Sequence, residues 1–133
     1  MAFEMHDFGV WPAGRLEHII ESDVLTYCPT RRAEIPRSIE YPLNHVEQET
    51  GFDFFGSTID YMLALAVTAK PQRIGIWGVS GDEEYSYQRV SLAAWMGLAI
   101  GRGIAVYPRP DWFRWRDPGG LAGVYSHRYG WVE

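Results

Sequence analysis

The chain contains one cysteine, Cys28, and one lysine, Lys70, among its 133 residues. A single cysteine excludes a disulfide within the chain and is typical of a reducing compartment. The longest apolar run, residues 61–67, is too short to span a bilayer, and no basic segment followed by an apolar one marks a secretory signal. These absences predict a single-domain cytoplasmic protein that does not associate with membranes.

The charge balance is acidic, with a formal net charge of −5, and eleven of the twelve lysines and arginines are arginine. A protein that binds nucleic acid without specificity needs a net basic face, so nucleic acid is not an expected partner. The arginine bias either reflects genomic base composition or provides guanidinium groups for carboxylates and phosphates. No Walker loop, GxGxxG, GxSxG or zinc motif is present, so we predict neither a metal nor a cofactor.

Hydrophobic patterning predicts alternating strands and helices. Strands are expected at residues 2–6, 23–28, 39–41, 73–78 and 104–107, and helices at 15–20, 43–49, 59–69 and 84–100. Elements of these lengths in this order predict βαβ units, and therefore a small Rossmann-like α/β fold with a mainly parallel sheet flanked by helices. The pattern is lost after Pro108. We therefore divide the single domain into a core, residues 1–108, and an aromatic, arginine-rich tail, residues 109–133.

The helices expected at 59–69 and 84–100 are apolar on nearly every face. Such helices must be covered on more than one side, which is difficult in a domain of this size. Either the tail packs on the core or a second subunit covers it, and we predict a homo-oligomer. Tryptophan and arginine in the tail could also stack nucleobases, but they are equally typical of the core of an oligomer interface.

A candidate anion site lies at Gly56-Ser57-Thr58, immediately before a buried helix. The first N–H groups of a helix lack partners within the helix, and its dipole is positive at that end, so Ser57 and Thr58 are predicted to bind a phosphate or carboxylate. The alternative is that either hydroxyl is an ordinary N-cap with no ligand.

A second candidate group comprises Asp82, Glu84, Tyr85, Gln88 and Arg89, which follow an expected strand. Ligands of α/β folds bind at the carboxyl edge of the sheet, so this group is predicted to contact a ligand there. Asp82 or Glu84 could accept from ribose hydroxyls, hold a divalent cation or act as a general base. The alternative is that these acids only complement the dipole of the next helix.

Four histidines are present, and none has the spacing of a metal motif. A lone histidine at the end of a strand is more often structural than catalytic. His6 is therefore a weak catalytic candidate, together with Asp82 and Glu84.

Several blocks of the sequence resemble a group of bacteriophage Rossmann-like proteins of unassigned function. The blocks are FEMHDFGVW, GSTIDYMLALAV, RIGIWGVSGDEEYSYQR, GLAIGRGIAVYPRP and the terminal RYGWVE. Residues 56–78 are also distantly similar to the 6-hydroxymethylpterin pyrophosphokinase-like motility accessory factors and to bacterial CMP-sugar sialyltransferases. Those relatives begin with a strand and a glycine-rich turn, and this chain is expected to lack that first βα unit.

The resemblance implies a small-molecule-binding protein whose ligand is a nucleotide or a nucleotide derivative. In a phage setting it would sequester a host signalling nucleotide in the host cytoplasm and so counter a host defence. Two alternatives stay open. One is a transferase or hydrolase acting on a nucleotide or nucleotide-sugar, with His6, Asp82 or Glu84 as acid or base. The other is a non-catalytic structural protein that assembles through its aromatic tail.

Overall fold

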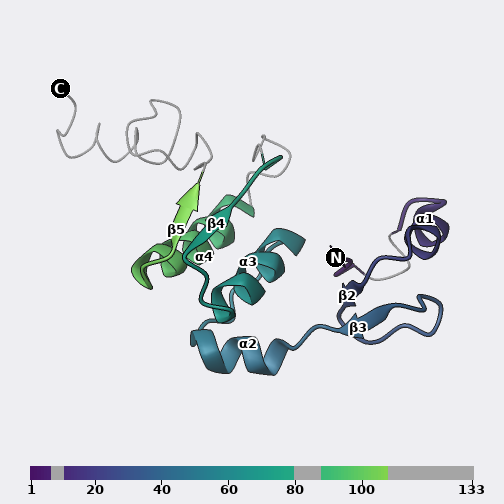
Figure 1. Ribbon diagram of the computed structural model, residues 1–133, viewed down its shortest axis with the longest axis horizontal. Coiled ribbons are helices and arrows are strands. Elements are labelled where there is room, and N and C mark those ends of the chain that lie inside the picture. The colour runs from purple at the N-terminus through teal and green to yellow at the C-terminus, as the bar shows by residue number, and fades with distance from the viewer. Residues whose placement is uncertain (7–10, 80–87, 108–133) are drawn as a thin grey trace. The chain divides into compact units, whose positions relative to one another are not determined.

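The computed structural model describes residues 1–6, 11–79 and 88–107 (Figure 1). The chain divides into two compact units, Met1–Asp53 and Phe54–Glu133. Each unit contains short parallel strands and helices. No helix in the described part of the chain is long and apolar enough to cross a membrane.

The first unit is built on a three-stranded parallel sheet. Its elements are β1 (Ala2–Phe3), α1 (Arg15–Ser22), β2 (Thr26–Cys28), β3 (Ser38–Glu40) and α2 (Leu43–Thr50). The strand order is β1-β2-β3, with Phe3 opposite Tyr27 and Tyr27 opposite Ile39. Parallel neighbours need a crossover connection, and α1 lies within the one that joins β1 to β2.

Helix α1 packs on the first unit through an apolar stripe. Ile19 is buried with Cys28 and Ile35, and Leu16 packs against this cluster one turn away. The helix begins after Gly14, whose φ of 80° is left-handed, and ends at Asp23, which is also left-handed. Its amphipathic pattern therefore explains both its formation and the face that it buries.

Aromatic rings connect the strands of this sheet. Phe3 stacks on Tyr27 with ring centroids 4.9 Å apart, and Tyr41 meets both rings edge-on at 6.5 and 6.1 Å. Cross-strand aromatic pairs contribute about 0.2–1 kcal/mol each to a sheet. The three rings thus support strands that are only two or three residues long.

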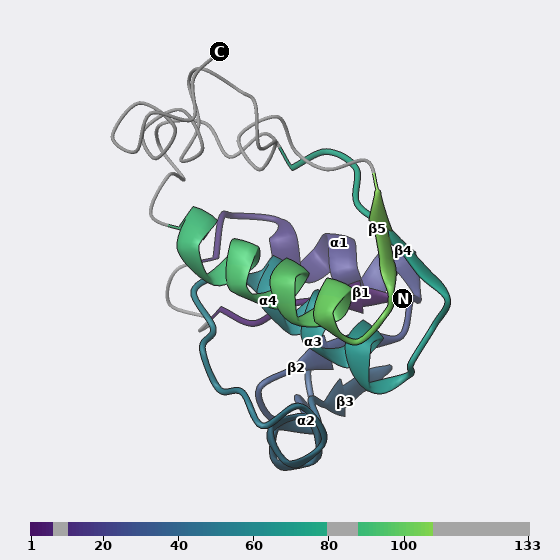
Figure 2. The same ribbon diagram turned by 90° about the vertical axis from the view of Figure 1, so that its left-hand side faces the viewer.

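The second unit contains α3 (Thr58–Thr68), β4 (Arg73–Gly75), α4 (Arg89–Gly101) and β5 (Ala105–Tyr107). Strands β4 and β5 are parallel, with Ile74 opposite Val106. Helices α3 and α4 contact one another, and Figures 1 and 2 show them side by side. Their buried side chains are Leu63, Ala64 and Val67 from α3, and Leu92, Trp95, Met96 and Ala99 from α4.

The predicted fold class is confirmed, because helices alternate with short parallel strands as in a small Rossmann-like fold. Several details differ from the prediction. Strand β1 ends at Phe3, where residue 6 was expected, and β2 begins at Thr26, where residue 23 was expected. The described strands form two small sheets, where one was expected, and β4 ends at Gly75, where residue 78 was expected. Residues 84–87 of the expected second long helix and the tail at 109–133 lie outside the described residues.

Candidate functional site

Helix α3 begins at the turn that the sequence singled out. Ser57 is its N-cap, in extended conformation, and its Oγ accepts a hydrogen bond of 3.4 Å from the backbone N–H of Asp60. The carboxylate of Asp60 reaches back, and its Oδ2 accepts from the backbone N–H of Gly56 at 2.7 Å. This pattern is similar to a capping box, except that the carboxylate accepts from Gly56, the residue before the N-cap, and it explains why the helix begins here.

The Asp60 side chain is fully buried, with 0% of its surface exposed. Its second oxygen, Oδ1, is a buried polar side-chain atom for which the described chain provides no hydrogen-bond partner. A buried acceptor without a donor costs about 1–3 kcal/mol. The positive end of α3 is therefore already occupied by a carboxylate, and one oxygen of that carboxylate still lacks a donor.

The segment before α3 lies against the first turns of α4. A Cβ built on Gly56 would stand 2.6 Å from Ser91 Oγ, so the backbone at Gly56 directly abuts this side chain. One turn further along α4, the indole Nε1 of Trp95 donates to the carbonyl of Phe54 at 2.8 Å. The ring of Phe55 lies 5.1 Å from that of Trp95. Helices α3 and α4 therefore begin side by side.

Helix α4 begins differently from α3. Its N-cap, Gln88, makes no side-chain cap hydrogen bond, and its first turn contains no acidic residue. The first helical residue is Arg89, a cation at the end where the dipole favours anions. Ser91 uses its hydroxyl to donate to the carbonyl of Gln88 at 3.1 Å, so that hydroxyl does not cap the N–H groups. The N–H groups at this end thus have no cap from the Gln88 side chain, and a guanidinium belongs to the first helical residue.

The structure thus brings together two groups that the sequence named separately. Ser57 and Thr58 begin α3, while Gln88 and Arg89 begin α4 beside them. In alternating βα units the helices begin at the carboxyl edge of the parallel strands, which is where such folds bind ligands. The predicted contacts Asp82, Glu84 and Tyr85 lie outside the described residues.

His6 lies in the first unit and contacts Glu4, which in turn pairs with Arg15; sequence reasoning missed both of these residues. Its Nδ1 is 2.8 Å from Glu4 Oε1, and Arg15 Nε donates to Glu4 Oε2 at 2.5 Å. The Glu4 side chain is only 2% exposed, although the residue follows strand β1 directly. The sequence signal for these contacts was an acidic residue inside the short apolar strand expected at residues 2–6. A carboxylate that such a strand buries requires charged or hydrogen-bond-donating partners.

Cys28 ends β2 in the same unit and is buried. Burial raises the pKa of the Cys28 thiol, the charge of Arg32 acts to lower it, and the carboxylate of Glu4 raises it further. The net direction is upward, so the thiol is protonated and unreactive at neutral pH.

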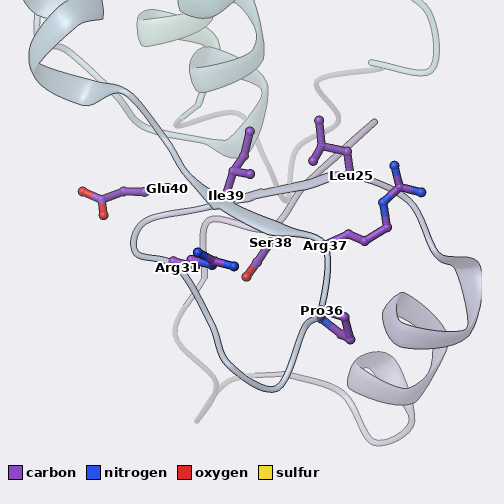
Figure 3. A pocket seen from close by; sticks show the side chains of 7 residues that line it. All are labelled: Leu25, Arg31, Pro36, Arg37, Ser38, Ile39 and Glu40. Atoms are coloured by element: carbon purple, nitrogen blue, oxygen red, sulfur yellow. The ribbon is translucent and has the colours of Figure 1, made fainter.

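Two hollows lie away from these groups. One, of about 510 Å³, is lined by β3 and by residues that precede it in the chain. Figure 3 shows Arg31 near one end of this hollow and Arg37 near the other. Arg37 is partly engaged, since its Nη1 lies 3.3 Å from Asp23 Oδ2. The other, of about 350 Å³, is lined by the ends of α3 and α4, including Lys70 and Arg102. Cations there complement the negative ends of the two helix dipoles.

Within residues 1–6, 11–79 and 88–107, no three His, Cys, Asp or Glu side chains group to hold a metal ion. Comparison with known proteins gives no match to a family model, to a curated protein or to a solved structure. The functional argument therefore rests on the residues of the chain.

Proposed function

We propose that the chain binds a small anionic ligand of the nucleotide class where α3 and α4 begin. The observation that carries the proposal is the contrast between the two helix ends. Helix α3 is capped by its own Ser57 and Asp60, whereas the N-cap of α4, Gln88, makes no side-chain cap hydrogen bond and its first residue is the cation Arg89. The start of α4 is therefore the end at which an external anion would be stabilised most.

We use the contrast between the two helix starts to propose where the phosphate of the ligand and its hydrogen-bond donors would lie. The sequence alone placed the phosphate on Ser57 and Thr58, but the Asp60 carboxylate beside them would repel a second anion. We therefore assign the phosphate to the first turn of α4, at Gln88 and Arg89. Asp60 Oδ1 is buried, so a ribose hydroxyl or a base amino group would provide the donor it lacks only after the turn at Gly56 moves aside. A nucleotide carries both chemical groups.

The test is isothermal titration calorimetry with a panel of nucleoside mono-, di- and triphosphates. Arg89→Ala should weaken binding about 10-fold or more, because a hydrogen bond to a charged group is worth about 1.5–3 kcal/mol. Arg102→Ala is the matched control, because it removes the same charge from the other end of the same helix, about 20 Å away. Equal effects of the two variants, or no binding by the wild-type chain, would contradict the proposal.

The biological role that we propose is sequestration of a host signalling nucleotide in the cytoplasm, as the phage resemblance implies. A sequestering protein returns its ligand chemically intact, whereas a transferase or hydrolase returns a product. Incubating the protein with each nucleotide that binds, then denaturing it and separating the released molecules by chromatography, distinguishes these roles.

We also propose that the chain forms a homo-oligomer through one face of the β4–β5 sheet. Parallel sheets are usually covered on both faces. Trp77 is 70% exposed and Tyr107 is 45% exposed, and their rings contact edge-on at 5.8 Å. Light scattering should find an oligomer that Trp77→Ser dissociates, and a monomeric wild-type chain at high concentration would contradict this.

A further inference from the structure

The geometry points to a proton-transfer site in the first unit, where His6 acts as a general acid and base and Glu4 holds its ring. The inference does not depend on nucleotide binding in the second unit. It concerns a substrate with a transferable group, attacked by water or by a hydroxyl.

The contact between His6 and Glu4 selects one form of the imidazole. A carboxylate accepts hydrogen bonds, so the ring nitrogen that faces it, Nδ1, carries the hydrogen. In the neutral ring this leaves Nε2 as the nitrogen with the free electron pair. The His6 side chain is 60% exposed, and the described chain provides no partner for Nε2. The reactive nitrogen is therefore open to a substrate.

The carboxylate oxygen of Glu4 that does not contact His6 is held by a cation. Its Oε2 is 2.5 Å from both Nε and Nη2 of Arg15, the first residue of α1. A buried carboxylate remains ionised when it is paired and hydrogen-bonded in this way. The backbone N–H of His6 also donates to Oε1, at 3.4 Å. Glu4 is thus a positioning residue that acts through His6 and does not itself reach a substrate.

The site lies where α/β folds bind their ligands. Glu4 and His6 follow the carboxyl end of β1, and Cys28 ends the neighbouring strand β2. The charged residues that the described part of the chain places at this edge include Glu4, Arg15, Arg32 and Glu40, which is the register partner of Cys28.

His6 takes up one proton and later returns it, so the reaction needs no further reactant. Nε2 takes a proton from the attacking water or hydroxyl, whose oxygen forms the new bond to the transferred group. The imidazolium then carries hydrogens on both nitrogens, and Nδ1–H still donates to Glu4. Nε2 returns its proton to the leaving oxygen when the old bond breaks, which restores the starting ring.

A purely structural role makes a different prediction. If Glu4 serves only to pair with Arg15 and join β1 to α1, the state of the His6 ring is incidental. Free imidazole favours hydrogen on Nε2, so an incidental ring would show that form. The tautomer therefore tests whether His6 and Glu4 make the contact on which the inference depends, and the reactivity of Nε2 then tests whether the ring is activated.

The decisive experiment is a ¹⁵N NMR measurement of the histidine rings in the full chain at a pH where they are neutral, with His6→Asn to assign the His6 signals. We expect His6 to carry its hydrogen on Nδ1, and His18 and His45, which make no such carboxylate contact within the described residues, to favour Nε2. Hydrogen on Nε2 of His6 in the wild-type chain would overturn the inference, with no need of a variant at Glu4.

Reactivity toward diethyl pyrocarbonate provides a second measurement. Nε2 attacks one carbonyl carbon, the bond to the central oxygen breaks, and the released ethyl carbonate gives carbon dioxide and ethanol. Peptide mass spectrometry should show His6 modified several-fold faster than His18, with the advantage lost in Glu4→Gln. Equal rates at His6 and His18 in the wild-type chain would contradict an activated ring.

Discussion

Gly56 is the position at which the packing of the two helix starts can be tested most sharply. Its Cβ-less backbone lies against Ser91, and an added methyl group would stand 2.6 Å from Ser91 Oγ and 3.3 Å from Ser91 Cβ. The hydroxyl can rotate away, but only by giving up its hydrogen bond to the carbonyl of Gln88. The Cβ of Ser91 is bonded to the backbone of α4, so it can move only if the helix moves. Ser91 is 1% exposed, so its surroundings oppose such a shift.

Gly56→Ala should therefore destabilise the chain by about 1–3 kcal/mol, the usual cost of an overpacked interior site. Gly97→Ala is the matched control, since Gly97 lies within α4 and a Cβ there would meet nothing within 4 Å. Alanine is the better helix former, so this variant should be more stable by about 0.5–1 kcal/mol. The same chemical change is thus expected to have opposite signs at the two positions.

The assay is urea unfolding of both variants and of the double variant Gly56→Ala/Ser91→Gly. Removing the Ser91 side chain relieves the clash, so the combined loss should be smaller than the sum of the single losses. If Gly56→Ala is as stable as the wild-type chain, or if the two losses simply add, Gly56 does not contact α4 as described.

Three further predictions concern buried groups. Asp60→Ala should cost about 1–3 kcal/mol in urea unfolding, because the Gly56 N–H loses its acceptor; an unchanged midpoint would contradict this capping contact. Trp95→Phe should destabilise by about 1 kcal/mol, because the carbonyl of Phe54 loses the hydrogen bond from the buried Trp95 indole, and an unchanged stability would refute this. Burial raises the pKa of Cys28 above 9.0, so unfolding above that pH releases a proton that the folded chain retains. The free energy of unfolding should therefore fall as the pH rises through this range, and Cys28→Ala should show less of that fall; identical pH dependence would contradict it.

Most of the fold could be predicted because its signals are local. Ser57 followed by Asp60 marks the start of α3, and the left-handed Gly51 marks the end of α2, as expected from glycine after a helix. The division of the strands between two sheets was not predictable. Pairing depends on contacts distant in sequence, such as Phe3 with Tyr27, that no local pattern contains.

The candidate site was predictable in its parts, but its internal geometry was not. Residue types and turn positions named Ser57, Gln88 and Arg89. Sequence could not show that Asp60 folds back on Gly56, because an acid in the first turn of a helix can equally point outward and only complement the dipole. The Glu4–Arg15 pair was missed for a similar reason, since its partners are eleven residues apart and meet only through the crossover.

The most direct test of the central claim is the identity of what the protein carries. The chain should be purified from cells, incubated with a nucleotide-rich lysate, repurified and denatured, and the released small molecules identified by mass spectrometry. The account predicts one intact nucleotide-class molecule in stoichiometric amount, retained by Arg102→Ala and lost or strongly depleted in Arg89→Ala. No released nucleotide from the wild-type chain, or equal retention by both variants, would contradict it.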